Sequence, residues 1–300
     1  MAIDMNERVA GVRPRRSVLY MPGSNARALE KARTLAADAL ILDLEDSVAP
    51  EAKEDARAQV CAAVAAGGYG RREVVVRVNG LGTPWGEGDL SAVAASGADA
   101  VCIPKVESGT DFMRAREVLA AADAPARLAI WAMIETPRAI LALEEIARAA
   151  DSPANPATVL VMGTNDLAKE TRAQLTADRL PMLAWLSRSV IAARAYGLDI
   201  LDGVYNNFRD EEGLRREALQ GRQLGMDGKT LIHPGQIAVA NEVFSPSQEE
   251  VAWARAIIAA FEQPENAGKG VITVDGNMVE LLHRDIALRT VAIAEATAGE

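Results

Sequence analysis

"ALILDLEDSVAP", residues 39–50, joins an apolar stretch directly to a cluster of acids. Five of its first six residues are apolar, which is typical of a strand buried on both faces. Asp43, Glu45 and Asp46 then follow within four positions. Carboxylates at the end of a buried strand are costly unless they are paired, bind a cation or reach water. Three roles are therefore open for them: metal binding, acid/base chemistry, or simple solvation.

The same apolar pattern recurs along the chain and alternates with helical periodicity. Continuous Val, Ile and Leu runs with helical crossovers predict parallel strands buried on both faces. Eight such β/α units in roughly 230 residues predict an α/β fold of the (β/α)8 TIM-barrel type. A doubly wound open sheet is the alternative, but the stretch "YMPGSNARALEK" (20–31) lacks its glycine-rich phosphate turn. The predicted strands are 17–21, 39–44, 73–78, 100–105, 128–134, 158–163, 199–205 and 229–234, and the predicted helices include 25–36, 50–66, 110–122, 138–150, 180–196 and 211–225, with a less distinct one near 87–96.

The residues after about 245 exceed what eight units need. The stretch "SPSQEEVAWARAIIAAF" opens with a capping box, in which Glu250 follows Ser247 by three positions. The stretch "VITVDGNMVE" predicts a short hairpin turning at Asp275–Gly276, and a helix is expected over 281–297. We therefore predict a barrel domain over 1–245 and a C-terminal helix–hairpin–helix extension over 246–300, packing on the barrel or on a neighbouring subunit as a lid.

Composition narrows the classes of partner. The chain has 300 residues, 49% of them hydrophobic, and a formal net charge of −10. This charge argues against nucleic acid and anionic membranes as partners, although a local basic pocket can still bind an anionic small molecule. The two cysteines, Cys61 and Cys102, offer neither a disulfide framework nor zinc-ligand spacing. The N-terminal stretch has no apolar signal region and no window resembles a membrane span, so we expect a cytoplasmic location.

Polar residues follow nearly every predicted strand. In a TIM barrel the active site lies at the C-terminal ends of the strands, so these side chains are expected to converge there. The set comprises Asp43, Glu45, Asp46, Arg77, Asn79, Lys105, Glu135, Thr164, Asn165, Asp166, Asp202 and His233.

The residue types in this set favour magnesium chemistry. Mg²⁺ prefers oxygen ligands and often takes one or two carboxylates, so Glu135 and Asp166 would leave positions open for a substrate. Arg77 would stabilise an oxyanion or enolate nearby. Together these residues indicate C–C bond making or breaking beside a carbonyl. Each has a plainer alternative: a strand-end carboxylate is more often solvated, Arg77 could serve a structural ion pair, His233 an orienting hydrogen bond, and His283 a structural contact.

Several segments together resemble a known family. They are "RSVLYMPGSN", "DALILDLEDSVAPEAK", "VVVRVNG", "AVCIPKVES", "AMIETPRAI", "VMGTNDLAKE", "LDGVYNNFRDEEGLRREA", "GMDGKTLIHPGQIAVANEVFSPSQEEVAWAR" and "VDGNMVE". Over nearly its whole length the chain is similar to the citrate lyase β-subunit / malyl-CoA lyase family of the HpcH/HpaI aldolase superfamily. The stretches "GTNDLAKE" and "DGVYNNFRDEEG" look most like the short malyl-CoA lyase/thioesterase branch.

The resemblance implies a Mg²⁺-dependent TIM barrel, with Mn²⁺ as an alternative metal, that acts on CoA thioesters as a homotrimer or homohexamer. It implies Glu135 and Asp166 as metal ligands and Arg77 as the contact to substrate and enolate. By the same resemblance Asp43, Glu45 and Asp46 would line the metal's water shell, with Asp46 as a candidate base. The expected contacts to the CoA nucleotide are Tyr20, Pro22, Gly23, Ser24 and Lys31.

Three activities remain open at this point. The first is cleavage of a malyl-CoA-type thioester to an oxo-acid such as glyoxylate and acetyl-CoA or propionyl-CoA. The second is hydrolysis of (3S)-malyl-CoA to malate and CoA, and the third is a citrate lyase β-like subunit that needs partner proteins. In the family an acidic residue in the tail loop is linked to hydrolysis; here Glu280 occupies that position where many members carry Asp, and Asn277 replaces a lysine. The acyl group, whether malyl, methylmalyl, citramalyl or citryl, also stays open.

Overall fold

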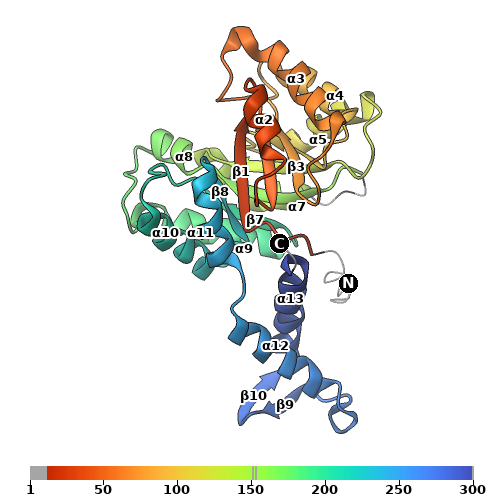
Figure 1. Cartoon of the computed structure of the whole chain (residues 1–300), viewed down its shortest axis with the longest axis vertical. Coiled ribbons are helices and arrows are strands. Elements are labelled where there is room, and N and C mark those ends of the chain that lie inside the picture. Colours follow the sequence, from red (N-terminus) through yellow and green to blue (C-terminus); the bar gives the residue numbers. More distant parts are fainter. Residues whose placement is uncertain (1–11, 151, 153, 299–300) are drawn as a thin grey trace. The chain divides into compact units, whose positions relative to one another are not determined.

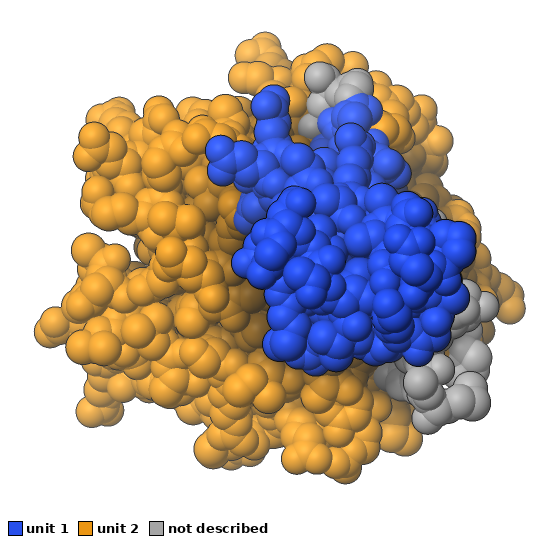
Figure 2. Space-filling model, turned by 90° about the horizontal axis from the view of Figure 1, so that it is seen from below, with its two compact units in different colours: residues 1–14, 245–300 blue, residues 15–244 orange. Residues whose placement is uncertain are grey.

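The structure is a computed structural model that describes residues 12–150, 152 and 154–298. Its residues divide into two compact units, shown in different colours in Figure 2. One unit is residues 15–244, and the other contains residues 12–14 and 245–298.

The larger unit is a closed barrel of eight parallel strands surrounded by helices (Figure 1). Each strand pairs with the next in chain order, and β1 pairs with β8 to close the ring. This confirms the predicted TIM barrel and excludes the open sheet. The strands are β1 (Ser17–Pro22), β2 (Ala39–Asp43), β3 (Glu73–Arg77), β4 (Ala100–Ile103), β5 (Ala129–Ile134), β6 (Ala157–Met162), β7 (Asp199–Asp202) and β8 (Gly228–Leu231).

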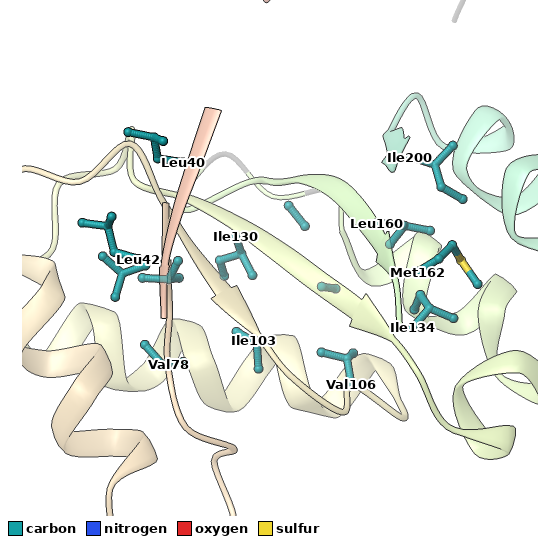
Figure 3. Close-up of a cluster of buried hydrophobic side chains, with 14 of the residues drawn as sticks. Leu40, Leu42, Val78, Ile103, Val106, Ile130, Ile134, Leu160, Met162 and Ile200 are labelled. Atoms are coloured by element: carbon teal, nitrogen blue, oxygen red, sulfur yellow. The ribbon is translucent and has the colours of Figure 1, made fainter. Parts of the chain in front are cut away.

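Alternating side chains explain why the strands read as continuous apolar runs. On β2, Ile41 packs inside the barrel, whereas Leu40 and Leu42 pack against the outer helices. Figure 3 shows part of this outer layer, including Leu160 of β6. Fully burying each such side chain contributes roughly 1.5–3 kcal/mol. Because both faces are covered, no polar alternation is needed until the strands end.

Helices follow most strands close to the predicted positions. The range 138–150 forms two short helices, because the backbone leaves the helical conformation at Ala142 (φ −98°, ψ 11°). Two helices, α8 and α11, lie outside the predicted ranges. The helices of this unit are α2 (Ala26–Ala32), α3 (Lys53–Ala66), α4 (Gly86–Ala94), α5 (Gly109–Ala121), α6 (Pro137–Leu141), α7 (Leu143–Ala149), α8 (Thr164–Thr171), α9 (Leu183–Ala195), α10 (Glu211–Leu224) and α11 (Ile237–Phe244), with 3-10 turns at Pro50–Ala52, Leu180–Met182 and Pro234–Gln236.

Arg15 lies at the N-terminal end of the barrel. Its guanidinium contacts Glu73 at 2.7 Å and Asp199 at 2.5 Å, the first residues of β3 and β7. It also lies 5.4 Å from the ring centroid of Trp131. The charges of Arg15, Glu73 and Asp199 compensate one another and are mostly buried. This end of the barrel therefore carries structural contacts. The opposite end carries the candidate site.

The smaller unit contains α12 (Gln248–Phe261), a 3-10 turn (Pro264–Asn266), a two-stranded sheet and α13 (Leu281–Thr297). The capping box at Ser247 and Glu250 forms as predicted. Strands β9 (Val271–Val274) and β10 (Asn277–Glu280) turn at Asp275–Gly276, both with positive φ, as the hairpin prediction requires. A small apolar core of Ala254, Ile257, Ile272, Val274, Val279 and Ala287 holds these elements together. No helix among the described residues is long and apolar enough to cross a membrane.

A buried ion network joins β7, β8 and α10. Asp202 accepts hydrogen bonds from Arg179 at 2.6 and 2.8 Å and from Lys229 at 3.1 Å. Lys229 also contacts Glu217 at 2.6 Å. Burial alone would raise the pKa of Asp202, but the charges of Lys229 and Arg179 lower it. The side chains of Asp202 and Lys229 are fully buried, so removing one partner leaves an uncompensated charge.

We expect Asp202→Ala to lower the free energy of unfolding by about 3 kcal/mol or more, the usual cost of breaking a buried ion pair. The matched control is Glu242→Ala, which removes a carboxylate from an exposed ion pair with Arg215. The control should change stability far less, because an exposed ion pair contributes little. Urea unfolding at pH 7 measures both values, and equal values for the two variants would contradict the prediction.

Candidate active site

The core of the site is an ion pair between two neighbouring strand ends. Asp43 and Arg77 are the last residues of β2 and β3 and lie side by side in the sheet register. Arg77 donates to both carboxylate oxygens of Asp43, with Nε–Oδ1 at 2.7 Å and Nη2–Oδ2 at 2.8 Å. Asp43 also accepts the backbone N–H groups of Glu45 and Ser47. One carboxylate therefore fixes both the arginine and the loop that follows β2.

Charge compensation sets the ionisation of this pair. Burial alone would raise the pKa of Asp43, but hydrogen bonds and the positive charge of Arg77 lower it below its usual value. Burial alone would lower the pKa of Arg77, but the contact with Asp43 raises it. Asp43 is therefore ionised at neutral pH and holds the arginine; it is a weak proton acceptor.

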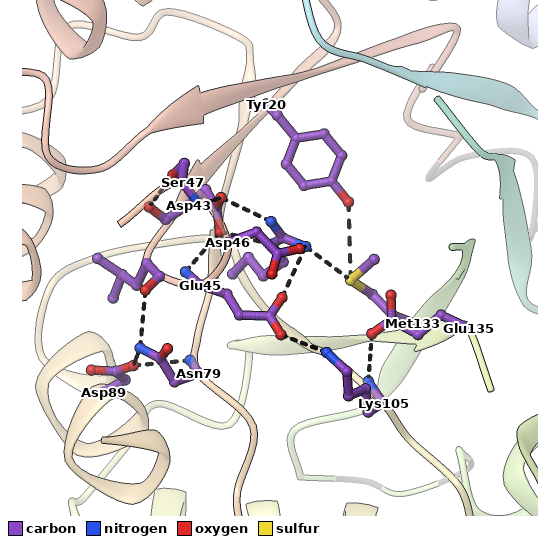
Figure 4. Close-up of polar contacts among 12 residues, drawn as sticks. Tyr20, Asp43, Glu45, Asp46, Ser47, Asn79, Asp89, Lys105, Met133 and Glu135 are labelled. Atoms are coloured by element: carbon purple, nitrogen blue, oxygen red, sulfur yellow. Dashed lines mark hydrogen bonds and ion pairs between the residues drawn. The ribbon is translucent and has the colours of Figure 1, made fainter. Parts of the chain in front are cut away.

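The other acids of the opening stretch also contact Arg77. Its Nη1 lies 2.9 Å from Glu45 Oε2 and 3.4 Å from Asp46 Oδ2. Figure 4 shows these contacts, with the ring of Tyr20 nearby; the Tyr20 centroid is 4.9 Å from the guanidinium carbon. The side chain of Glu45 is 12% exposed, whereas that of Asp46 is 65% exposed. Asp46 is therefore the most accessible of the three acids.

Glu135 and Asp166 form a second acidic pair without an arginine. Glu135 follows β5 and is almost fully buried, and Asp166 lies in the first turn of α8, after β6. The backbone N–H of Lys105 donates to Glu135 Oε1 at 2.8 Å. Burial, followed by the charge of Glu45, raises the pKa of Glu135 to about 7. The negative charge of Asp166 contributes in the same direction.

These side chains line a cavity of about 420 Å³ at the C-terminal end of the barrel. Both predicted metal-binding residues contribute to it, together with Arg77, Asp43 and Asp46. Its lining is Tyr20, Pro22, Asp43, Asp46, Ser47, Arg77, Met133, Glu135, Met162, Gly163, Thr164, Asn165, Asp166, Val204, Thr230 and Ile232.

The arrangement fits a hard divalent cation. Two carboxylates from adjacent strand ends share the cavity, and a cation there would offset both the burial of Glu135 and the negative charge of its acidic neighbours, which together raise its pKa. Among the described residues there is no group of three or more His, Cys, Asp or Glu side chains placed to hold a metal. Mg²⁺ commonly binds through one or two carboxylates and keeps its other positions for water and substrate, so the donor set is compatible with it.

The predicted contacts to the nucleotide fall in two places. Tyr20 and Pro22 line the cavity, whereas Ser24, just before α2, and Lys31, in the last turn of α2, are exposed. Gly23 is buried, and its N–H donates to the carbonyl of Asp43 at 2.9 Å. A Cβ at Gly23 would lie 2.5 Å from that carbonyl oxygen, so the close approach of β1 and β2 requires glycine here.

Five residues of the predicted strand-end set do not line the cavity: Glu45 and Lys105, which contact each other, and Asn79, Asp202 and His233, which serve other contacts. Asn79 binds Asp89 and the carbonyl of Leu44. Asp202 belongs to the buried ion network. His233 accepts the N–H of Gly235 through Nδ1 and stacks on Phe208, which matches its predicted orienting role. The apolar lining residues Met133, Met162, Val204 and Ile232 were not predicted, because an apolar side chain at a strand end carries no distinguishing signal.

Glu280 lies in the smaller unit. It is the N-cap residue of α13, where its carboxylate accepts a backbone N–H of the first turn. Its own backbone N–H donates to His283 Nδ1 at 2.9 Å. His283 therefore has the structural role predicted for it.

Sequence comparison places this geometry in a family. The sequence model of HpcH/HpaI aldolase/citrate lyase matches residues 16–234. The chain belongs to the HpcH/HpaI aldolase/citrate lyase family. It is 53% identical to a (3S)-malyl-CoA thioesterase of Cereibacter sphaeroides (strain KD131 / KCTC 12085), over 95% of this chain and 96% of that relative. It is 36% identical to the citrate lyase subunit beta of Escherichia coli (strain K12), over 89% of each chain.

A solved structure of the same family is also similar. The protein CitE from Mycobacterium tuberculosis, in complex with magnesium, acetoacetate and coenzyme A, matches with a TM-score of 0.70 and 30% identity. The match covers 94% of this chain and 98% of that one. The HpcH/HpaI aldolase/citrate lyase barrel is thus shared between this chain and a relative solved with magnesium.

The raised pKa of Glu135 predicts an unusual pH dependence for the metal-free protein. An unfolded glutamate titrates near 4.3, and Glu135 in the folded protein titrates at about 7. Between these values the folded state binds more protons, so stability falls as the pH rises. We expect the free energy of unfolding of the wild type to fall by an amount on the order of 2–4 kcal/mol between about pH 5 and 8. Glu135→Gln is expected to remove this fall.

Urea unfolding of both proteins in EDTA measures this difference. Titrating groups remote from Glu135 affect both proteins alike, so the comparison reports Glu135 together with the groups coupled to it. Parallel stability curves for the two proteins would show that Glu135 titrates near its ordinary value.

Proposed function

We propose that the protein hydrolyses a malyl-CoA-type thioester to the free hydroxy acid and CoA. The observation that carries this proposal is the 53% identity, over nearly the whole length of both chains, to a relative named (3S)-malyl-CoA thioesterase. The cavity supports it, because it combines a buried arginine with two carboxylates suited to Mg²⁺. Our first sequence-based expectation favoured C–C cleavage and kept hydrolysis as the alternative; the identity to the thioesterase supports that alternative better.

The proposed roles follow from the contacts. A bound Mg²⁺ would supply a Lewis acid beside the hydroxy-acid end of the substrate, held by Glu135 and Asp166. Arg77, kept in place by Asp43, stabilises negative charge on the thioester carbonyl oxygen. Lys105 and Arg77 hold Glu45 from two sides. Asp46 is the accessible carboxylate of the cavity and is the candidate base for C–C cleavage, the second candidate reaction.

Hydrolysis balances as follows. Water attacks the thioester carbonyl carbon and gives its proton to a carboxylate. The C–O bond forms, the C–S bond breaks, and the thiolate takes a proton to give free CoA. We assign the accepting carboxylate to Glu280, the acidic residue at the position that the family links to hydrolysis.

C–C cleavage is the second candidate. The 36% identity to the citrate lyase subunit beta of Escherichia coli favours it. In this reaction Asp46 removes the hydroxyl proton, the adjacent C–C bond breaks, and Arg77 stabilises the resulting thioester enolate until a proton is returned. The products are glyoxylate and acetyl-CoA.

Product analysis separates these candidates. Incubation of the purified protein with malyl-CoA and Mg²⁺ is expected to release malate and free thiol in equal amounts, with no glyoxylate. Glyoxylate without free thiol would overturn hydrolysis and support cleavage.

The Glu280→Gln variant tests the assigned base. The amide keeps the length and hydrogen-bonding capacity of the N-cap but cannot accept the proton of water. We expect thiol release to fall by about 100-fold or more, the usual contribution of a general base. The control Glu265→Gln changes an exposed acid of the same unit and should keep full activity. Full thiol release by Glu280→Gln would remove this residue from the mechanism.

The metal assignment has its own test. We expect Glu135→Ala and Asp166→Ala to weaken Mg²⁺ binding by about 100-fold or more, because each removes one of the two protein carboxylates. Asp46→Asn should slow turnover while changing the Mg²⁺ dissociation constant by less than about threefold, since Asp46 is not assigned to the metal. Isothermal titration calorimetry without substrate measures these constants. A collapse of Mg²⁺ affinity in Asp46→Asn would show that the metal has been assigned to the wrong pair of acids.

A further inference from the structure

Lys105 has an unusual backbone at the edge of the candidate active site. It lies two residues after β4 and has φ +51°, in the left-handed region that side chains other than glycine rarely adopt. Strained backbone of this kind persists where the surroundings hold it, and it is frequent at functional sites. The contacts of Lys105 show what this conformation achieves.

The backbone N–H of Lys105 holds one oxygen of a buried carboxylate. It donates to Glu135 Oε1 at 2.8 Å. On the other side of Glu135 lies Gly163, where an added Cβ would overlap Glu135 and come within 2.5 Å of its Oε2. The carboxylate is thus confined between an amide and a glycine, with Oε1 engaged and Oε2 beside a residue that lines the cavity.

The side chain of Lys105 holds a second carboxylate. Its Nζ lies 2.9 Å from Glu45 Oε1, while Glu45 Oε2 lies 2.9 Å from Arg77 Nη1. Figure 4 shows Lys105 between Glu45 and Glu135. A single residue therefore orients one acid through its backbone and another through its ammonium group.

We propose that Lys105 is a positioning residue whose left-handed backbone orients Glu135 for Mg²⁺. The inference rests on the magnesium site proposed above. Mg²⁺ demands near-ideal octahedral geometry at short distances, so a ligand held by a fixed donor binds it better than a freely rotating one. The ammonium group of Lys105 has the separate task of holding Glu45 against Arg77.

Two matched substitutions separate the backbone from the charge. Lys105→Met and Lys105→Ile both remove the ammonium group and have similar size. Methionine tolerates the left-handed conformation about as well as lysine, whereas the β-branched isoleucine disfavours it strongly. Lys105→Gly removes the backbone strain, because glycine adopts positive φ without strain and keeps the backbone amide.

Mg²⁺ binding without substrate is the measurement. We expect Lys105→Met and Lys105→Gly to bind Mg²⁺ at least as tightly as the wild type, since a nearby positive charge has been removed. Lys105→Ile is expected to bind about tenfold or more weakly than Lys105→Met. Equal constants for the Ile and Met variants would overturn the inference. If the wild type itself binds no Mg²⁺, the proposed metal site and the inference about Lys105 are both wrong. The proposed activity is tested separately, by product analysis with malyl-CoA.

Hydrogen exchange gives a second test that does not depend on the folding of Lys105→Ile. In the metal-free protein, Glu135→Ala should speed exchange of the Lys105 amide by about tenfold or more, because its acceptor is lost. The control Asp166→Ala should leave that rate unchanged. An unchanged rate in Glu135→Ala would show that the amide does not hold this carboxylate.

Discussion

The bidentate pair between Asp43 and Arg77 is the interaction around which the candidate active site is arranged. A buried ion pair is weak support for stability, because desolvation of both charges offsets most of their attraction. In this protein the ion pair between Asp43 and Arg77 matters because it fixes the positions of the groups around it. The same carboxylate that holds the guanidinium at the mouth of the barrel also accepts two N–H groups of the following loop. The loop carrying Glu45 and Asp46 is thereby fixed against Arg77.

This pairing divides the acids of the site into two groups with different electrostatics. Asp43, Glu45 and Asp46 surround the guanidinium, so much of their charge is compensated by the protein. Glu135 is held instead by the backbone N–H of Lys105, and burial, followed by the charge of Glu45, raises its pKa to about 7. Glu135 and Asp166 are the acids to which we assign the cation. The acids of "LDLEDSV", for which metal binding was one of three open roles, all contact Arg77.

The sequence was sufficient to predict the barrel and the place of most acids at the strand ends. It was not sufficient to predict the residues that these acids contact. Strands buried on both faces read as continuous apolar runs, so the eight strands and their order followed from the pattern alone. The contacts of residues at strand ends are harder to predict from the sequence, because the last side chain points into the barrel or toward the helices according to register. Asp202 and Asn79 point to buried partners outside the cavity for this reason. The left-handed backbone of Lys105 has no sequence signal, since lysine is not selected for that conformation.

Hydrolysis and C–C cleavage place different demands on the same barrel. Both reactions develop negative charge on the thioester carbonyl oxygen, which is the charge that we propose Arg77 stabilises. They differ in whether water reaches the carbonyl carbon together with a base. That difference depends on a carboxylate outside the strand ends, and Glu280 at the start of α13 is the acid assigned to it. Glutamate is one methylene longer than the aspartate of many relatives and keeps the carboxylate. Under the proposed assignment, the choice between the two reactions rests on residues 277–284, because both reactions would use the charged strand ends in the same way.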